Sequence, residues 1–183
     1  MKNIISLIFL LVIICLTSCN NVDDNAQNSI DQLPPATQTG ANAVGCLVNG
    51  EVFLPRQEGI NPAVVVNYEF FEGDFFFSLS FDDQKGVGLK GVTIGTLRVS
   101  LQTGQTYILN KNNIDDGDFT GGGGLYTINT QINYYTNSTT TGELTITRID
   151  LSNSIISGTF WFDAINAEGD IVEIREGRFD YQY

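Results

Sequence analysis

Gly158-Thr159-Phe160-Trp161-Phe162-Asp163-Ala164 is the stretch that decides the fold class of this chain. Successive residues of a β-strand point to opposite faces, so every second residue shares a face. One face of this stretch holds Phe160, Phe162 and Ala164, and the other holds Thr159, Trp161 and Asp163. Such strict alternation is typical of a half-buried strand. It predicts a strand whose phenylalanines enter a core and whose opposite face carries Trp161.

The segments around this stretch predict an antiparallel meander. Strand-like patterns cover residues 125–136, 142–150, 155–166 and 170–183, and turn residues separate them around 137–141, 152–154 and 167–169. In the segment 142–150, Leu144 and Ile146 form an apolar face while Glu143, Thr145 and Thr147 face outward. Short alternating segments broken by turns indicate antiparallel β structure. The C-terminal block therefore contains at least four expected strands.

The preceding part of the chain predicts two hairpins and a less regular middle. Residues 44–48 and 52–54 flank Asn49-Gly50, a pair that readily takes positive φ at both turn centres. Residues 63–71 and 75–82 flank Glu72-Gly73-Asp74, and the second segment places Phe75, Phe77, Leu79 and Phe81 on one face. Residues 88–101 form one bent strand or two short ones, and residues 106–109 form a short strand. No segment has the period of an amphipathic helix.

These patterns predict one all-β domain over residues 42–183. We expect an antiparallel β-sandwich of about 8–10 strands. A lipocalin-like closed β-barrel is the alternative, with a small apolar ligand inside. The two differ in whether the inward phenylalanines fill the interior or leave a cavity of several hundred Å³, roughly the size of a ligand pocket.

The longest polar interruption, residues 110–124, contains three carboxylates and four consecutive glycines. Asp115, Asp116 and Asp118 could supply oxygen ligands to an adventitious calcium ion, but the spacing places Ile114 at a ligand position of an EF-hand. The glycine run, residues 121–124, lacks the Lys-Ser/Thr of a phosphate-binding loop. We therefore predict a flexible acidic loop and no cofactor.

Composition excludes several function classes. The chain has 183 residues with 9 Lys or Arg, 21 Asp or Glu and a formal net charge of −12, which disfavours nucleic acid as a partner. It has no histidine, so a Ser/His/Asp site, a Cys/His site or a histidine-based zinc site cannot form. Carboxylate pairs, which glycosidases use, remain available at Asp82-Asp83, at Asp163 with Glu173 and at residues 115–118. We expect a non-enzymatic protein, with a carboxylate-dependent glycan-active enzyme as the alternative.

The N-terminus has the order of a secretory signal. Lys2 is followed by an apolar run over residues 4–16, which is shorter than the roughly 20 residues needed to span a bilayer. The run ends in Leu16-Thr17-Ser18-Cys19, which resembles the lipobox of bacterial lipoproteins. The resemblance implies that residues 1–18 are removed and that Cys19 is lipidated, which anchors the protein to a membrane without spanning it. Several acyl chains together make a stable anchor.

The expected mature chain has one free cysteine and a polar segment after Cys19. Cys15 leaves with the signal peptide, and Cys46 remains alone in an apolar strand, where we expect a buried small hydrophobe. Residues 20–41 are polar and aperiodic, so residues 19–41 are expected to form the lipidated cysteine and a disordered tether. The expected location is the outer membrane, on its periplasmic face or at the cell surface.

A second resemblance covers most of the mature chain. Gly142-Glu143-Leu144-Thr145-Ile146-Thr147, Ile156-Ser157-Gly158-Thr159-Phe160 and Glu176-Gly177-Arg178-Phe179-Asp180 are similar to segments of Bacteroidetes lipoproteins classed as domains of unknown function. Val48-Asn49-Gly50-Glu51-Val52-Phe53 is similar to their opening hairpin. The resemblance implies an exported β-rich fold and carries over no catalytic residue. We expect a binding or structural role in the cell envelope, with a protein or glycan partner that meets Trp161, Tyr134 or Tyr135 on an outer sheet face.

Overall fold

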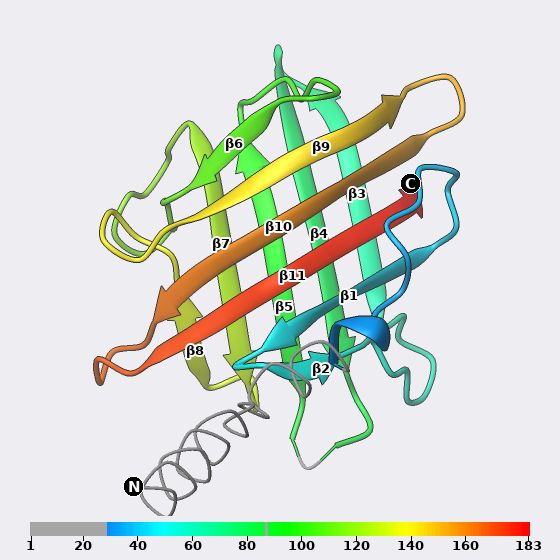
Figure 1. Ribbon diagram of the computed structural model, residues 1–183. Helices are drawn as coiled ribbons and strands as arrows, with labels where there is room; N and C mark the ends of the chain where they lie inside the picture. The colour runs from blue at the N-terminus through cyan, green and yellow to red at the C-terminus, as the bar shows by residue number, and fades with distance from the viewer. Residues whose placement is uncertain (1–28, 87) are drawn as a thin grey trace, which may run out of the picture.

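The computed structural model describes residues 29–86 and 88–183 and contains eleven strands in this part of the chain (Figure 1). The strands are β1 (Ala43–Val48), β2 (Glu51–Phe53), β3 (Val64–Phe71), β4 (Asp74–Asp83), β5 (Lys90–Leu97), β6 (Thr106–Leu109), β7 (Gly121–Ile128), β8 (Ile132–Tyr135), β9 (Gly142–Asp150), β10 (Ile155–Ile165) and β11 (Ile171–Gln182). The predicted all-β class is confirmed.

The strands form two layers that cross each other. The hydrogen-bonded order is β2-β1-β11-β10-β9-β6-β7-β5-β4-β3, and β8 pairs with both β7 and β10. In Figure 1, the layer of β1, β11, β10, β9 and β6 lies across the layer of β3, β4, β5 and β7. The layers join where β6 meets β7 in a parallel pairing of Leu109 with Gly122, an exception to the predicted antiparallel pattern. The result is a β-sandwich that is continuous along one side.

Large apolar side chains fill the space between the layers. Phe81 and Phe162 are fully buried, and Phe77 and Phe160 are nearly so. Phe160 also packs against Phe81 and Phe179, with ring centroids 6.3 and 6.4 Å apart. Inward phenylalanines occupy the interior, and β2 and β3 end the strand order, so the fold is the predicted sandwich and not the alternative closed barrel.

Most of the predicted local structure is present, with one extra strand. Asn49 and Gly50 take φ values of 51° and 82° in the turn between β1 and β2, as their sequence predicted. The segment 125–136, which we predicted to be continuous, is divided into β7 and β8 by a turn in which Asn129 and Thr130 have φ of 54° and 60°. A β-branched threonine rarely adopts positive φ, so its sequence gives no sign of this turn.

The glycine run, predicted to lie in a loop, instead opens β7. A Cβ atom on Gly122 would lie 2.8 Å from the Ile108 carbonyl oxygen, and one on Gly124 would lie 3.0 Å from the Phe162 ring. A Cβ atom on Gly123 would overlap the Lys111 carbonyl oxygen. The glycines therefore allow the backbones of the two layers to approach closely where the layers meet, a need that local sequence does not reveal.

The predicted tether is ordered over its second half. Leu33 is buried, and residues 37–41 lie on the β domain through hydrogen bonds to the Asp180 carboxylate. Residues 1–28, including the signal segment and Cys19, lie outside the described residues. Within the described part of the chain, no helix is both long and apolar enough to cross a bilayer.

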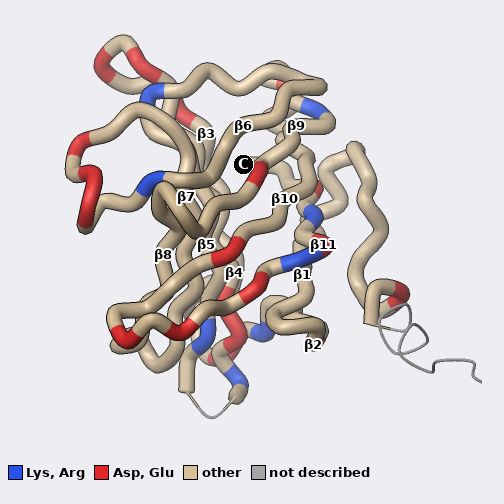
Figure 2. The backbone as a smooth tube through the Cα atoms, turned by 60° about the vertical axis from the view of Figure 1, so that its left-hand side comes forward, with Lys and Arg blue, Asp and Glu red and all other residues tan. Residues whose placement is uncertain are grey.

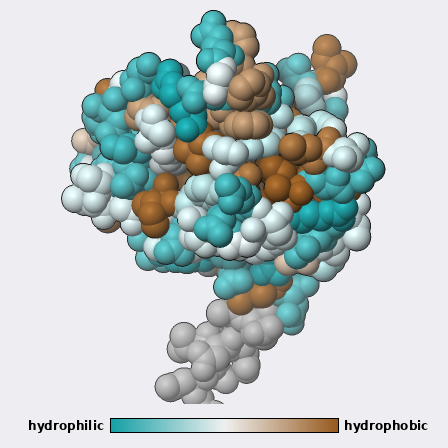
Figure 3. Space-filling model, turned by 90° about the horizontal axis from the view of Figure 1, so that it is seen from above, coloured by the Kyte–Doolittle hydropathy of each residue, from teal (hydrophilic) through white to brown (hydrophobic). Residues whose placement is uncertain are grey.

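Charge and hydropathy are mixed over the surface. Figure 2 shows acidic residues spread over several loops and strands rather than gathered in one patch. Figure 3, which views the molecule from above, shows hydrophobic side chains interspersed with hydrophilic ones on that end. No single charged patch therefore dominates these views of the described surface.

Candidate binding groove on the outer sheet face

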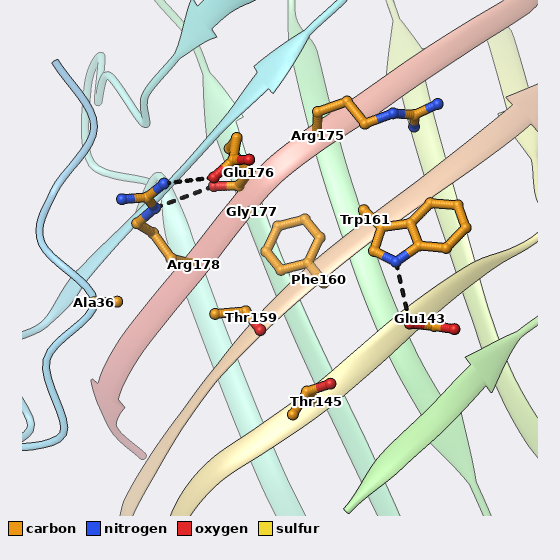
Figure 4. Close-up of a pocket in the computed structure, with 10 residues that line it drawn as sticks. All are labelled: Ala36, Glu143, Thr145, Thr159, Phe160, Trp161, Arg175, Glu176, Gly177 and Arg178. Carbon is orange, nitrogen blue, oxygen red and sulfur yellow. Dashed lines mark hydrogen bonds and ion pairs between the residues drawn. The ribbon is translucent and has the colours of Figure 1, made fainter. Parts of the chain in front are cut away.

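A groove of about 570 Å³ lies on the outer face of β9, β10 and β11 (Figure 4). The ordered N-terminal segment contributes Ala36 to its wall. The other residues that line it are Glu143, Thr145, Thr159, Phe160, Trp161, Arg175, Glu176, Gly177 and Arg178. The groove thus combines one exposed aromatic side chain, that of Trp161, with charged groups and hydroxyls from three adjacent strands.

Trp161 is exposed because the strand alternation of β10 leaves it on the outer face. Phe160 and Phe162 on either side are buried, whereas the Trp161 side chain is 37% exposed. The indole Nε1 donates a hydrogen bond to the Glu143 carboxylate at 3.3 Å, and the Arg175 guanidinium lies 5.5 Å from the ring centroid (Figure 4). These two contacts from neighbouring strands hold the ring in a defined orientation.

A β-bulge in β11 lies directly opposite Trp161. Phe160 pairs with Gly177 and Phe162 pairs with Ile174, so β11 carries one extra residue across from Trp161. Within the bulge, Glu176 takes φ of 54°, a conformation that costs a non-glycine residue about 1–2 kcal/mol. Bulges that hold strained residues are common beside functional sites, where they redirect side chains.

The carboxylates of this region are paired with arginines. Arg175 contacts Asp163 at 2.6 Å and Glu173 at 3.5 Å, and Arg178 contacts Glu176 at 3.0 Å. The predicted pair Asp163 and Glu173 is thus close together, but Arg175 lies between its charges. Both carboxylates of this pair are therefore ion-pair partners of one arginine.

The three aromatic residues predicted for an outer face do not come together. Trp161 lines the groove, whereas Tyr134 packs 5.9 Å from Tyr126 at the edge of the core. Tyr135, the next residue of β8, lies with Asn112 in another surface depression. Adjacent residues of a strand face opposite sides, so Tyr134 and Tyr135 could not share a surface.

The three aspartates predicted as a weak metal site have different partners. Asp118 pairs with Arg98 at 2.6 Å and Asp116 pairs with Lys111 at 3.0 Å, while Asp115 accepts a hydrogen bond from the Asn112 side chain. In residues 29–86 and 88–183, no group of three His, Cys, Asp or Glu side chains is placed to hold a metal ion. The backbone between the three carboxylates does not make them converge.

The remaining candidate groups are also accounted for. Asp83 pairs with Arg56, which lowers the pKa of Asp83, while burial raises the pKa of Asp82 on the opposite face of β4. Cys46 is fully buried, as predicted, and burial strongly raises the pKa of its thiol. Neither the adjacent aspartates nor this cysteine forms a convergent reactive site.

Two features of the groove were missed by the sequence reasoning. The first is the bulge at Glu176, and the second is the contribution of Ala36, which precedes the residues 37–41 that bond to Asp180. Asp180 is 1% exposed although it follows the inward-facing Phe179 in the chain. Its partners in the N-terminal segment lie about 140 positions away, so no local pattern indicates them.

The model of a family described as "Domain of unknown function (DUF6252)" matches residues 63–181. The chain belongs to this family. The matched range begins just before β3 and contains every groove residue except Ala36. No curated protein and no solved structure matches the chain. The family description assigns no activity, so the groove geometry has to support any function.

Proposed function

We propose that this protein is a lipid-anchored, non-catalytic module of the bacterial outer membrane that binds a glycan in the Trp161 groove. The observation that carries the glycan proposal is the exposed, oriented indole of Trp161 in a groove of the outer sheet face, beside polar side chains. The lipobox at residues 16–19 supports the anchor, and the secretory order of the residues before it supports export.

The groove chemistry suits a sugar better than other ligand classes. An aromatic ring offers an apolar face to the C–H groups of a sugar ring while its polar edge remains hydrogen-bonded. Thr145, Thr159 and Arg178 place hydroxyl and guanidinium groups near that face, where they can bind sugar hydroxyls. The net charge of −12 opposes a polyanionic partner such as nucleic acid.

A binding role is favoured over catalysis by the state of the carboxylates. Glu143 accepts the Trp161 hydrogen bond and Glu176 pairs with Arg178, so both acids of the groove already have donors. A glycosidase needs two carboxyl groups at a set separation, one of them with a raised pKa. The arrangement supports recognition of a sugar without cleavage.

The glycan proposal is tested by fluorescence, because Trp161 is the single tryptophan of the chain. The full chain in detergent is titrated with a panel of soluble cell-envelope and host polysaccharides while its emission is recorded. We expect a saturable change with at least one glycan, and loss of binding by calorimetry in Trp161→Ala. The matched control is Phe71→Ala, which removes another exposed aromatic residue, in β3.

Two results would count against the glycan proposal. In the first, Trp161→Ala binds the glycan with unchanged affinity. In the second, the protein responds to no polysaccharide of the panel and instead binds a protein through Trp161. Release of a cleaved sugar during the titration would instead support the enzymatic alternative.

The anchor is tested separately with Cys19→Ala. We expect this variant to lose palmitate labelling and to leave the membrane fraction, while its glycan affinity stays unchanged. Continued membrane fractionation with palmitate incorporation would contradict the lipobox assignment. Protease treatment of intact cells then distinguishes the surface from the periplasmic face, since only an exposed domain is digested.

A further inference from the structure

β3 is a long edge strand whose outer side lacks a partner in the described chain. It pairs with β4 over eight consecutive residue pairs without a shift, and the strand order ends there. The two-residue turn at Glu72-Gly73 makes Phe71 and Asp74 the first hydrogen-bonded pair, so the odd-numbered residues of β3 bond to β4. The backbone N–H and C=O groups of Val66, Tyr68 and Phe70 therefore point to the open side.

This edge lacks the features that normally prevent strand pairing. The other edge strand, β2, has three residues and is soon followed by Pro55, which makes it a poor template. β3 has eight residues and contains no proline, lysine or glycine. Natural edges are usually shortened, charged, bulged or covered, and an uncovered long apolar edge marks a site of strand addition.

The side chains of β3 are also unusually apolar for an exposed strand. Phe70 and Phe71 are 63% and 59% exposed, and Val65 is 45% exposed. Glu69 is the only charged residue of the strand.

We propose that β3 pairs antiparallel with β3 of a second copy of this chain, about a two-fold axis through Tyr68. Only registers that place even-numbered residues opposite each other join the open backbone groups of both copies. With Tyr68 opposite Tyr68, the outer face pairs Val65 with Phe71 and Asn67 with Glu69. On this face each apolar residue then meets an apolar residue, and the carboxylate meets an amide.

The neighbouring registers are less favourable than the register centred on Tyr68. Centring the pair on Glu69 would set two carboxylates opposite each other, which destabilises a sheet. Centring it on Asn67 would set Val65 opposite Glu69. The register through Tyr68 is self-complementary, as a two-fold interface requires, and it extends the β3–β4–β5–β7 layer into a continuous sheet across two copies.

Disulfide cross-linking tests the register in native membranes that contain the full chain. Asn67 and Glu69 of the partner form a pair without hydrogen bonds, with Cα atoms about 4.5 Å apart, within disulfide range. We expect N67C/E69C to form a covalent dimer on mild oxidation, and N67C or E69C alone to stay monomeric. A covalent dimer in either single variant would overturn the proposal. A cross-link to a different protein would also overturn it and would indicate an extended peptide as the partner of β3.

A second measurement keeps the test independent of cysteine chemistry. Val66→Pro removes an N–H that points to the open edge and keeps the bonds to β4, so the variant should fold. By sedimentation of the full chain in detergent, we expect the wild type to dimerise and Val66→Pro to dimerise at least about tenfold more weakly. Leu151→Ser, at an exposed apolar position away from β3, is the matched control and should leave the dimer unchanged. A monomeric wild type, or a dimer that Val66→Pro does not weaken, would overturn the proposal.

Discussion

Asp180→Asn should release the N-terminal segment from the β domain. The Oδ2 atom of Asp180 accepts hydrogen bonds from the Thr37 hydroxyl at 2.7 Å and from the amides of Thr39 and Ala41 at 2.8 and 3.1 Å. Its Oδ1 atom accepts from the Gly40 amide at 2.8 Å and the Ser157 hydroxyl at 2.7 Å. These donors converge on one nearly buried carboxylate, so replacing one of its oxygen atoms by an NH₂ group disturbs the whole contact.

The expected loss of stability in Asp180→Asn follows from the hydrogen bonds that an amide NH₂ group cannot accept. Asparagine keeps one acceptor oxygen and places an NH₂ group where Oδ1 accepts two bonds. Hydrogen bonds to a charged group contribute about 1.5 kcal/mol or more each, so two lost bonds cost about 3 kcal/mol. For a domain of this size, that corresponds to a melting temperature lower by about 6–12 °C. Amide hydrogen exchange at residues 39–41 should become faster.

The pH dependence gives a second signature. Burial raises the pKa of Asp180, but the hydrogen bonds from Thr37, Ser157, Thr39 and Ala41 outweigh burial and hold the pKa well below its ordinary value. A depressed folded-state pKa stabilises the protein above the unfolded value of about 4, and this stability is lost as pH falls through that range toward the folded-state pKa. The difference in melting temperature between wild type and Asp180→Asn should therefore narrow from pH 6 to pH 3.

Thermal unfolding followed by circular dichroism, at several pH values, tests this reasoning. Other carboxylates with depressed pKa, such as Asp150, are present in both proteins and cancel in the comparison. A melting temperature of the variant within about 1 °C of the wild type at pH 6 would refute the energetic argument. A difference that stays constant down to pH 3 would refute the assigned pKa direction.

Four further predictions concern single positions elsewhere. Gly142→Ala should lower the free energy of unfolding by about 2–3 kcal/mol, because its Cβ would overlap the Trp161 carbonyl and Phe162. Gly50 has φ of 82° and no atom within 4 Å of the added Cβ, so Gly50→Ala should lower the free energy of unfolding by only about 1 kcal/mol. Equal losses for Gly142→Ala and Gly50→Ala in urea titrations would contradict the packing argument. Cys46 should resist a thiol reagent at pH 8 until the protein is unfolded, because burial raises its pKa, and native labelling at the rate of a free thiol would be evidence against its burial. Glu176→Gly should raise the free energy of unfolding by up to about 1 kcal/mol, because the relief of left-handed strain exceeds the loss of an exposed ion pair. A destabilised Glu176→Gly protein would show that the Arg178 pair matters more.

The strands and their inward faces could be read from short stretches of sequence. The alternation at residues 158–164 predicts the buried Phe160 and Phe162 and the outward Trp161. Asn49-Gly50 predicts the first hairpin because both residues tolerate positive φ. The first prediction depends on the pleat of one strand and the second on the geometry of one turn, so the residues that indicate each feature lie within a short stretch. The exposed position of Trp161 in the candidate groove could be predicted from sequence for the same reason.

The tertiary structure alone decided which distant segments meet. Gly122, Gly123 and Gly124 belong to a strand because β6 and β10 approach them closely. Asp180 is buried because residues 37–41 supply donors to its carboxylate, and Tyr134 lies away from the groove because its ring packs against Tyr126 at the edge of the core. The bulge that sets Glu176 opposite Trp161 depends on pairing with both β1 and β10. Sequence by itself determined the period of each strand. Contacts between segments that are distant along the chain determined where the strands cross and what the groove contains, because backbone periodicity carries no information about non-local partners.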